Sequence, residues 1–202
     1  MELTETSQYK DKKVSGYMLN AGLSKENQQK VAAINLQLKQ EFGDVILDQP
    51  GSALHVTLMD WVAPLVTYEK DHDALFKEVF DTYDNVLSSL AGNTKIFNVT
   101  FDTIRCSPAA IFIQGHDDGQ FQSLRDGFTN QIELVAGTKQ PPKIVHCTIA
   151  RFDAAVDINQ IKQFVETLSI HFQQPVHDFR LVHEVEMPML SYETLKIYPL
   201  FR

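Results

Sequence analysis

The sequence has few of the features that mark secreted, membrane-spanning or metal-binding proteins. Its 202 residues include only two cysteines, Cys106 and Cys147, and no run of apolar residues approaches the length of a membrane span. The two cysteines form no spaced cluster, so a disulfide framework is not predicted. The first residues, 1–13, are polar and charged, and they lack the apolar segment of a secretory signal. We therefore expect a soluble, cytoplasmic protein with no membrane association.

Basic residues are also scarce. The chain has 18 Lys and Arg against 26 Asp and Glu, which gives a formal net charge of −8. This balance argues against a protein that holds long nucleic acid mainly through its backbone phosphates, although a local pocket can still hold a small nucleotide. Hydrophobic residues at 44% and charged residues at 22% are typical of a globular protein. The length allows one large domain or two small lobes.

Two short segments of the chain share one pattern, LHVTL at Leu54–Leu58 and VHCTI at Val145–Ile149. Side chains in a strand alternate between its two faces, so His55 and Thr57 lie together on one face while their aliphatic neighbours lie on the other. The same alternation places His146 and Thr148 together. A single His-x-Thr pattern often marks no more than a half-buried strand. Two copies, each in a predicted strand with aliphatic neighbours, indicate a duplicated functional motif.

Strict alternation also makes predictions for the residues that follow each motif. If the first strand continues, Trp61 lies on the face of His55 and Thr57 and can stack on a nucleobase, although it can equally be a rim or core aromatic. The same rule turns Arg151 away from His146. The other histidines show no metal-ligand spacing, so we predict no metal site; they are His72, His116, His171, His177 and His183.

Hydrophobic periodicity and turn residues predict an ordered series of helices and strands. Strands are predicted at 14–19, 53–61, 95–105, 110–114, 144–151, 179–186 and 194–200. Helices are predicted at 24–42, 68–91, 121–137 and 157–168. The order strand, helix, histidine strand, helix, strand occurs twice and is followed by a closing strand, which indicates an internal duplication.

We predict a single bilobal α+β domain spanning residues 1–202. A polar, mobile lead-in occupies 1–12, and two pseudo-repeats span about 13–106 and 107–202. The predicted fold is a duplicated one, in which two antiparallel sheets face a central cleft and the helices lie outside. We expect the protein to be a monomer.

The motifs and their duplicated order resemble those of the 2H phosphoesterase superfamily, which includes 2′,5′-RNA ligase-like (LigT-like) proteins and cyclic nucleotide phosphodiesterases. The resemblance runs from Val14 to Leu200. It rests on the segments 55–58 and 146–151 and on the closing segment 192–200. It implies that His55 and His146 act as a catalytic pair, with no cofactor; which of them is the base and which the acid stays open.

Two histidines on opposite walls of a cleft can supply both the base and the acid that transfer at a phosphodiester requires, because imidazole titrates near about pH 6.5. The hydroxyls of Thr57 and Thr148 can hydrogen-bond the non-bridging phosphate oxygens. We therefore predict a metal-independent phosphodiesterase hydrolysing a 2′,3′-cyclic phosphate, a 2′–5′ linkage or a cyclic (oligo)nucleotide. The expected partner is a nucleotide or short oligonucleotide. The alternatives are a 2′–5′ RNA ligase and a non-catalytic nucleotide-binding module with the same cleft.

Overall fold

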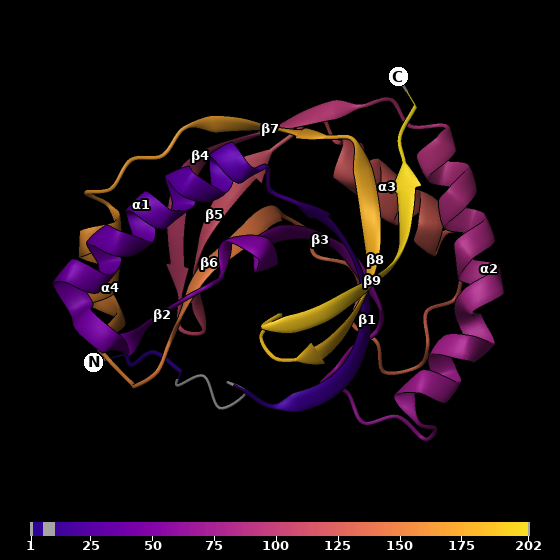
Figure 1. The fold of residues 1–202 in the computed structure, drawn as a ribbon, viewed down its shortest axis with the longest axis horizontal. Helices are drawn as coiled ribbons and strands as arrows, with labels where there is room; N and C mark the ends of the chain where they lie inside the picture. The colour runs from indigo at the N-terminus through magenta and orange to yellow at the C-terminus, as the bar shows by residue number, and fades with distance from the viewer. Residues whose placement is uncertain (1, 6–10, 202) are drawn as a thin grey trace.

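Two antiparallel sheets form the centre of the molecule in the computed structural model, which describes residues 2–5 and 11–201 (Figure 1). The first sheet consists, in spatial order, of β3 (His55–Val62), β1 (Lys13–Gly22), β8 (Asp178–Glu186) and β9 (Ser191–Pro199). The second consists of β2 (Ile46–Asp48), β6 (Val145–Phe152), β5 (Ala110–His116), β4 (Phe97–Ser107) and β7 (Phe172–Val176). The predicted α+β fold with two antiparallel sheets is confirmed.

Each sheet takes strands from both halves of the sequence. The strands β1 and β3 come from the first half and pair with β8 and β9 from the end of the chain. The second sheet likewise joins β4 to β5, β6 and β7. Each of the predicted pseudo-repeats, about 13–106 and 107–202, therefore contributes strands to both sheets.

Four helices cover the outer faces of the sheets (Figure 1). The second sheet carries α1 (Lys25–Phe42) and α4 (Ile158–Val165), and the first carries α2 (His72–Gly92) and α3 (Gln120–Thr129). The helix α2 begins four residues later than predicted, because the Asp71 side chain accepts hydrogen bonds from the backbone N–H groups of Asp73 and Ala74 and so caps the helix there. The helix α3 ends at Thr129, earlier than predicted, with Asn130 as its C-cap.

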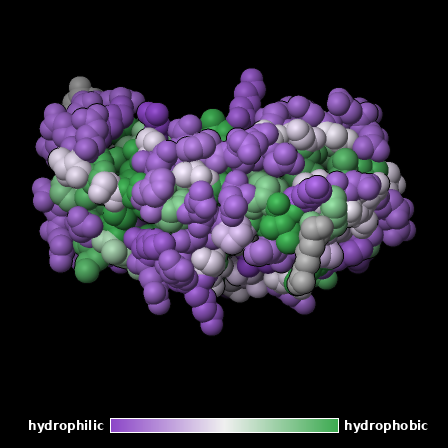
Figure 2. Space-filling model, turned by 90° about the horizontal axis from the view of Figure 1, so that it is seen from above, coloured by the Kyte–Doolittle hydropathy of each residue, from purple (hydrophilic) through white to green (hydrophobic). Residues whose placement is uncertain are grey.

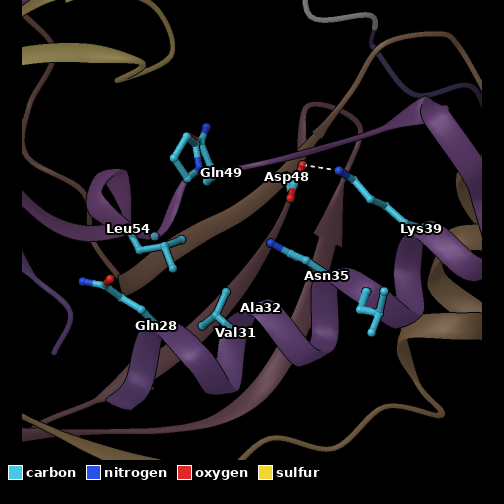
Figure 3. Close-up of a pocket in the computed structure, with 11 residues that line it drawn as sticks. Gln28, Val31, Ala32, Asn35, Lys39, Asp48, Gln49 and Leu54 are labelled. Carbon is cyan, nitrogen blue, oxygen red and sulfur yellow. Dashed lines mark hydrogen bonds and ion pairs between the residues drawn. The ribbon is translucent and has the colours of Figure 1, made fainter. Parts of the chain in front are cut away.

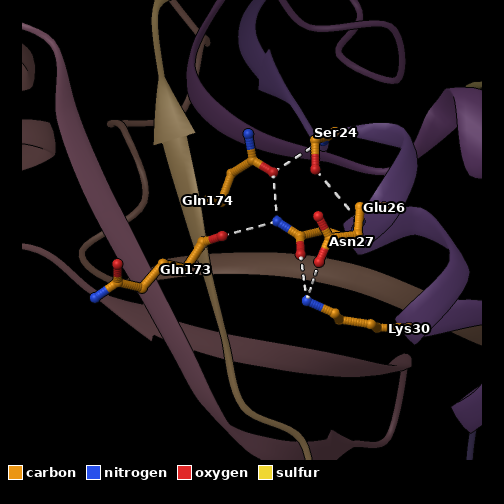
Figure 4. A network of polar contacts seen from close by, with 6 residues as sticks. All are labelled: Ser24, Glu26, Asn27, Lys30, Gln173 and Gln174. Atoms are coloured by element: carbon orange, nitrogen blue, oxygen red, sulfur yellow. Dashed lines mark hydrogen bonds and ion pairs between the residues drawn. The ribbon is translucent and has the colours of Figure 1, made fainter.

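The strands β2 and β7 are absent from the prediction. Only three residues form β2, and β7 contains Pro175, so neither gives a clear strand pattern. A buried polar network joins β7 to the start of α1 (Figure 4). The Gln174 side-chain oxygen accepts from the Ser24 N–H and from the Asn27 amide, each at 2.9 Å, and the Asn27 amide also donates to the Gln173 carbonyl. This network ties the end of β1 to the edge of the second sheet.

Residues 2–5 of the predicted mobile lead-in pack against the second lobe. Leu3 forms an isolated bridge with Asp157, and the backbone N–H of Thr4 donates to the Val156 carbonyl at 2.8 Å. The Thr4 side chain is buried. Mobility is therefore a wrong prediction for residues 2–5, whereas residues 6–10 lie outside the described part of the chain.

Several large apolar side chains are exposed among the described residues: Leu3, Leu36, Leu65, Ile144, Leu190, Leu195, Ile197 and Phe201. Figure 2 shows a mostly hydrophilic face with separate hydrophobic patches. Cys147 is buried, Cys106 is half-buried, and both are free thiols. Within residues 2–5 and 11–201, no helix has both the length and the apolar character needed to cross a bilayer.

Candidate active site

The two histidine motifs come together at one pocket between the sheets. His55 and Thr57 of β3 line it from the first sheet, and His146 and Thr148 of β6 line it from the second. The cavity measures about 260 Å³. The structure thus brings together all four residues of the two predicted His-Thr pairs.

Alternation holds within each motif. Leu54, Val56 and Leu58 are buried behind the first His-Thr pair. Val145, Cys147 and Ile149 are buried behind the second. Each pair is therefore held on a strand whose opposite face is anchored in the core, which fixes the direction of the polar side chains.

Alternation fails just after the first motif, at a β-bulge. Asn20 pairs with Thr57 but the preceding residue, Leu19, pairs with Met59, so Leu58 is an extra residue on β3. Asp60 therefore lines the pocket and Trp61 lies on the opposite face. The prediction that Trp61 shares the face of His55 and can stack on a base is wrong.

Trp61 is a core residue. Its side chain is 0% exposed and packs edge-on against Tyr83 of α2, with the ring centroids 5.3 Å apart. Phe128 of α3 lies 6.3 Å away on a nearly parallel plane. The indole thus joins β3 to both helices that cover the first sheet.

The second motif has the same bulge. On β6, Thr148 pairs with Phe112 and Ala150 pairs with Ile111, so Ile149 is the extra residue. The bulge turns Arg151 into the pocket, which corrects the prediction that it points away from His146. Asp60 and Arg151 therefore occupy equivalent places, five residues after each histidine. A charged residue stands five positions after the histidine in both motifs. This equal spacing was the signal in the sequence that could have identified Asp60 and Arg151 as pocket residues.

Both histidines are held by a backbone carbonyl two residues earlier. Nδ1 of His55 lies 2.6 Å from the Ala53 carbonyl, and the Ile144 carbonyl hydrogen-bonds His146. A carbonyl only accepts, so Nδ1 of His55 carries the hydrogen and Nε2 is left to exchange a proton with a ligand. Burial lowers the pKa of His55 to about 4 and also lowers the pKa of His146. Nearby arginines add to both shifts.

Two carboxyl groups face the same pocket. Burial raises the pKa of Asp60 to about 6 and that of Glu184 to about 6. Glu184 also accepts a hydrogen bond from the Met189 N–H at 2.6 Å. Arg151 supplies a positive charge in the same pocket. Burial lowers the pKa of its guanidinium, and the negative charge of Glu184 opposes that shift. The Nε atom of Arg151 is buried and has no hydrogen-bond partner among the described residues. The pocket therefore combines proton-exchanging groups with a cation whose hydrogen-bonding capacity is only partly used.

Two larger cavities among the described residues, with volumes of about 370 and 500 Å³, lack a pair of histidines. The first lies between α1 and the segment around β2, where Lys39 forms an ion pair with Asp48 (Figure 3). Its lining contains no histidine, and it meets the histidine pocket only at Gln49. Among the residues that the structure describes, no group of three His, Cys, Asp or Glu is arranged to hold a metal ion. The histidine pocket is therefore the candidate active site.

No protein-family model matches the chain, and no curated protein matches it either. Solved structures do match it. TT0787 of Thermus thermophilus aligns with a TM-score of 0.65 at 18% identity, over 92% of this chain and 97% of that one. E. coli LigT in its apo form aligns with a TM-score of 0.56 at 15% identity, over 94% and 99%.

The MHV ns2 PDE domain aligns with a TM-score of 0.54 at 16% identity, over 84% of this chain and 98% of that one. At these identities the likeness concerns the fold, and it extends along nearly the whole of each neighbour. The chain therefore shares its fold with LigT, TT0787 and the ns2 PDE domain.

Proposed function

We propose that the protein is a metal-independent phosphodiesterase that hydrolyses a 2′,3′-cyclic phosphate, a 2′–5′ linkage or a cyclic (oligo)nucleotide. The observation that carries this proposal is the lining of one cavity by His55, Thr57, His146 and Thr148. Binding alone does not require two proton-transfer groups on opposite walls. Their pairing favours an enzyme over a non-catalytic module.

The reaction uses the two histidines as base and acid. One imidazole, neutral, takes the proton of the attacking hydroxyl or water, and the other, protonated, gives a proton to the leaving oxygen. The carbonyl of Ala53 fixes the tautomer of His55 and the carbonyl of Ile144 restrains His146, so each ring is held in place before substrate arrives. After one turnover the base is protonated and the acid is neutral, and proton exchange with solvent restores the starting state of both rings.

The remaining pocket groups stabilise the phosphoryl oxygens. The hydroxyls of Thr57 and Thr148 lie on the same strand faces as the histidines and donate to non-bridging oxygens. Arg151 supplies positive charge where negative charge develops in the transition state, and burial strengthens that interaction. The half-buried position of these groups keeps bulk water from competing with the substrate.

The structural neighbours support a nucleotide as the ligand. Structures of E. coli LigT with ATP, with 3′-AMP and with NADP+ all align with this chain, at 15–18% identity. LigT has also been solved with phosphate. Nucleotide binding by a protein with the same fold is consistent with the proposed substrates.

The proposal is tested by a substrate screen with the wild-type protein and a His55→Ala, His146→Ala double variant. The screen covers 2′,3′-cyclic nucleotides, 2′–5′ oligonucleotides and cyclic dinucleotides. We expect turnover of at least one class by the wild type and none by the double variant. Joining of RNA ends would identify the ligase, and binding without turnover would identify the binding module.

Turnover should survive removal of divalent metal. The two histidines and Arg151 provide proton transfer and charge stabilisation by themselves, so we expect the same rate in excess EDTA as in buffer. The measurement is the initial rate on the best substrate after dialysis against chelator. Loss of the rate on chelation, with recovery on adding Zn²⁺ or Mn²⁺, would contradict the mechanism.

The pH dependence of kcat/KM should be bell-shaped, with its maximum on the acid side of neutrality. The active form has one neutral and one protonated histidine, so it is most abundant between the two pKa values of the pair. Because the pKa of His55 lies at about 4 and that of His146 below its usual value, the maximum should fall between about pH 4 and 6.5. A maximum of kcat/KM above pH 7 would contradict the assignment of proton transfer to His55 and His146.

Asp60 provides a control for the alkaline limb. Its pKa near 6 means that the pocket gains a negative charge above that pH, which opposes an anionic substrate. Asp60→Asn should therefore raise kcat/KM relative to the wild type mainly above pH 6, with the gain shrinking toward pH 5. A gain of equal size at every pH would show that the Asp60 charge does not contribute to the alkaline limb.

A further inference from the structure

The pocket face of the first sheet continues past the histidine strand toward the end of the chain. In the register of the sheet, Thr57 of β3 lies opposite Asn20 of β1, and Asn20 lies opposite Arg180 of β8. Residues directly opposite one another in an antiparallel sheet point to the same side. Arg180 and Asn20 therefore lie on the face that carries Thr57.

The guanidinium of Arg180 is held beside His55. Gly22 lies opposite His55 on the neighbouring strand, and a Cβ atom added to Gly22 would meet Nη2 of Arg180 at 2.7 Å. The guanidinium thus fills the space that a side chain at Gly22 would take. Nε and Nη2 of Arg180 both donate to the side-chain oxygen of Asn20, at 3.1 and 2.8 Å. An arginine is therefore fixed next to the first histidine by a buried amide.

The second sheet repeats this arrangement. Gln114 of β5 lies opposite His146, and Arg105 of the next strand, β4, donates from Nε to the Gln114 side-chain oxygen at 3.0 Å. Arg105 also lies opposite Phe112, whose ring packs edge-on against His146 with centroids 5.5 Å apart. On both walls the order is histidine strand, amide strand, arginine strand.

Neither arginine is neutralised. Across residues 2–5 and 11–201, no carboxylate lies within ion-pairing distance of Arg180 or Arg105. A guanidinium has five N–H donors, so both of these side chains keep donors for a ligand after binding their amides. Each arginine lies two strands away from a histidine strand, beside the pocket rather than in its lining. In a chain with a net charge of −8, two such uncompensated cations mark sites for anionic groups.

We propose that Arg180 and Arg105 bind the phosphoryl groups on either side of the scissile phosphate, so that the substrate is a short single-stranded oligonucleotide rather than a lone cyclic mononucleotide. This inference rests on the proposed function and narrows its substrate class. Guanidinium groups bind phosphate through paired N–H donors, and the amides of Asn20 and Gln114 orient them for it in advance.

An apolar surface accompanies the arginine on the first wall. Ile197 of β9 lies directly opposite Arg180 and is 55% exposed, and the Tyr192 ring lies 6.0 Å from the guanidinium. A sugar or base attached to the bound phosphoryl group would lie against these side chains. The first sheet thus offers contacts beside the pocket for a further nucleotide unit beyond the reacting one.

The test measures binding separately from turnover. A fluorescein-labelled tetradeoxynucleotide lacks 2′-hydroxyls and serves as the probe, and a nucleoside 3′-monophosphate serves as the short comparison ligand. Arg180→Ala and Arg105→Ala should each weaken binding of the tetranucleotide about tenfold, the cost of losing hydrogen bonds to a charged group. The weakening should be several times smaller for the monophosphate. Each variant should also lower the salt dependence of tetranucleotide binding, because fewer counterions are released.

The matched control is Lys30→Gln, since Lys30 lies on α1 and pairs with Glu26 away from the pocket. It should bind both ligands like the wild type. Equal losses for tetranucleotide and monophosphate in the arginine variants, or no loss for either, would overturn the inference even if the wild type is an active phosphodiesterase. Selective loss of tetranucleotide binding would support it even if the substrate screen finds no turnover, so the two proposals fail separately.

Discussion

Replacing either pocket histidine by alanine should lower kcat/KM by about 10²–10⁴-fold, the usual contribution of a positioned proton-transfer group. His55→Ala removes the imidazole held by the Ala53 carbonyl, and His146→Ala removes its counterpart on the opposite wall. Because one ring acts as base while the other acts as acid, the double variant should be little slower than either single variant. Steady-state rates on the best substrate of the screen provide the measurement.

The controls for this series lie in the same chain. His171→Ala changes an exposed histidine outside the pocket and should leave the rate unchanged. Thr57→Val or Thr148→Val should cost about 1–3 kcal/mol of transition-state stabilisation, the range for a lost hydrogen bond to a charged group. A folded His146→Ala protein with near wild-type turnover would refute the two-histidine mechanism.

Trp61→Ala should lower the free energy of unfolding by about 3–5 kcal/mol, the usual cost of removing a fully buried aromatic side chain. The indole fills the space between β3 and the helices α2 and α3, where it contacts Tyr83 and Phe128. The variant should bind nucleotide like the wild type under conditions in which it is folded. Urea denaturation and nucleotide titration measure the two properties independently.

Trp61→Phe separates packing from the indole N–H group. The Nε1 atom is buried without a hydrogen-bond partner among the described residues, so its removal forfeits no hydrogen bond. We expect this variant to lose much less stability than Trp61→Ala. If either variant bound nucleotide more weakly but kept its stability, Trp61 would be a binding residue rather than a core residue.

The shared face of each His-Thr pair was predictable from sequence, because strand alternation needs only three residues to place two side chains together. His55 and Thr57, like His146 and Thr148, are two positions apart, and no irregularity falls between them. The duplicated order of helices and strands then predicted the fold, since each helix has an apolar stripe and each histidine strand has an aliphatic face.

The errors at Trp61 and Arg151 have one physical cause. A bulge after each threonine inserts a residue, so the side chains that directly follow it, Asp60 and Trp61 on β3 and Arg151 on β6, lie on the face opposite to the one that alternation predicts. Bulges arise from the pairing of one strand with its neighbour, so a single strand read alone does not reveal them. Asp60 was missed for the same reason. The arginines 105 and 180 were missed because their relation to the histidines depends on sheet register between distant segments.

The joining of β8 and β9 to β1 sets the order in which the protein can be built during synthesis. Among the residues that the structure describes, the strand that carries His55 pairs with β1 alone, and β1 lacks its other neighbour until residues 178–186 have left the ribosome. Pairing over such a separation in sequence has a large loop-closure cost and slows folding. During most of translation the first sheet therefore consists of β1 and β3 alone, and the edge of β1 that later pairs with β8 is exposed. Nascent-chain chaperones that cover exposed edges should matter more for this protein than for a helical one of equal length.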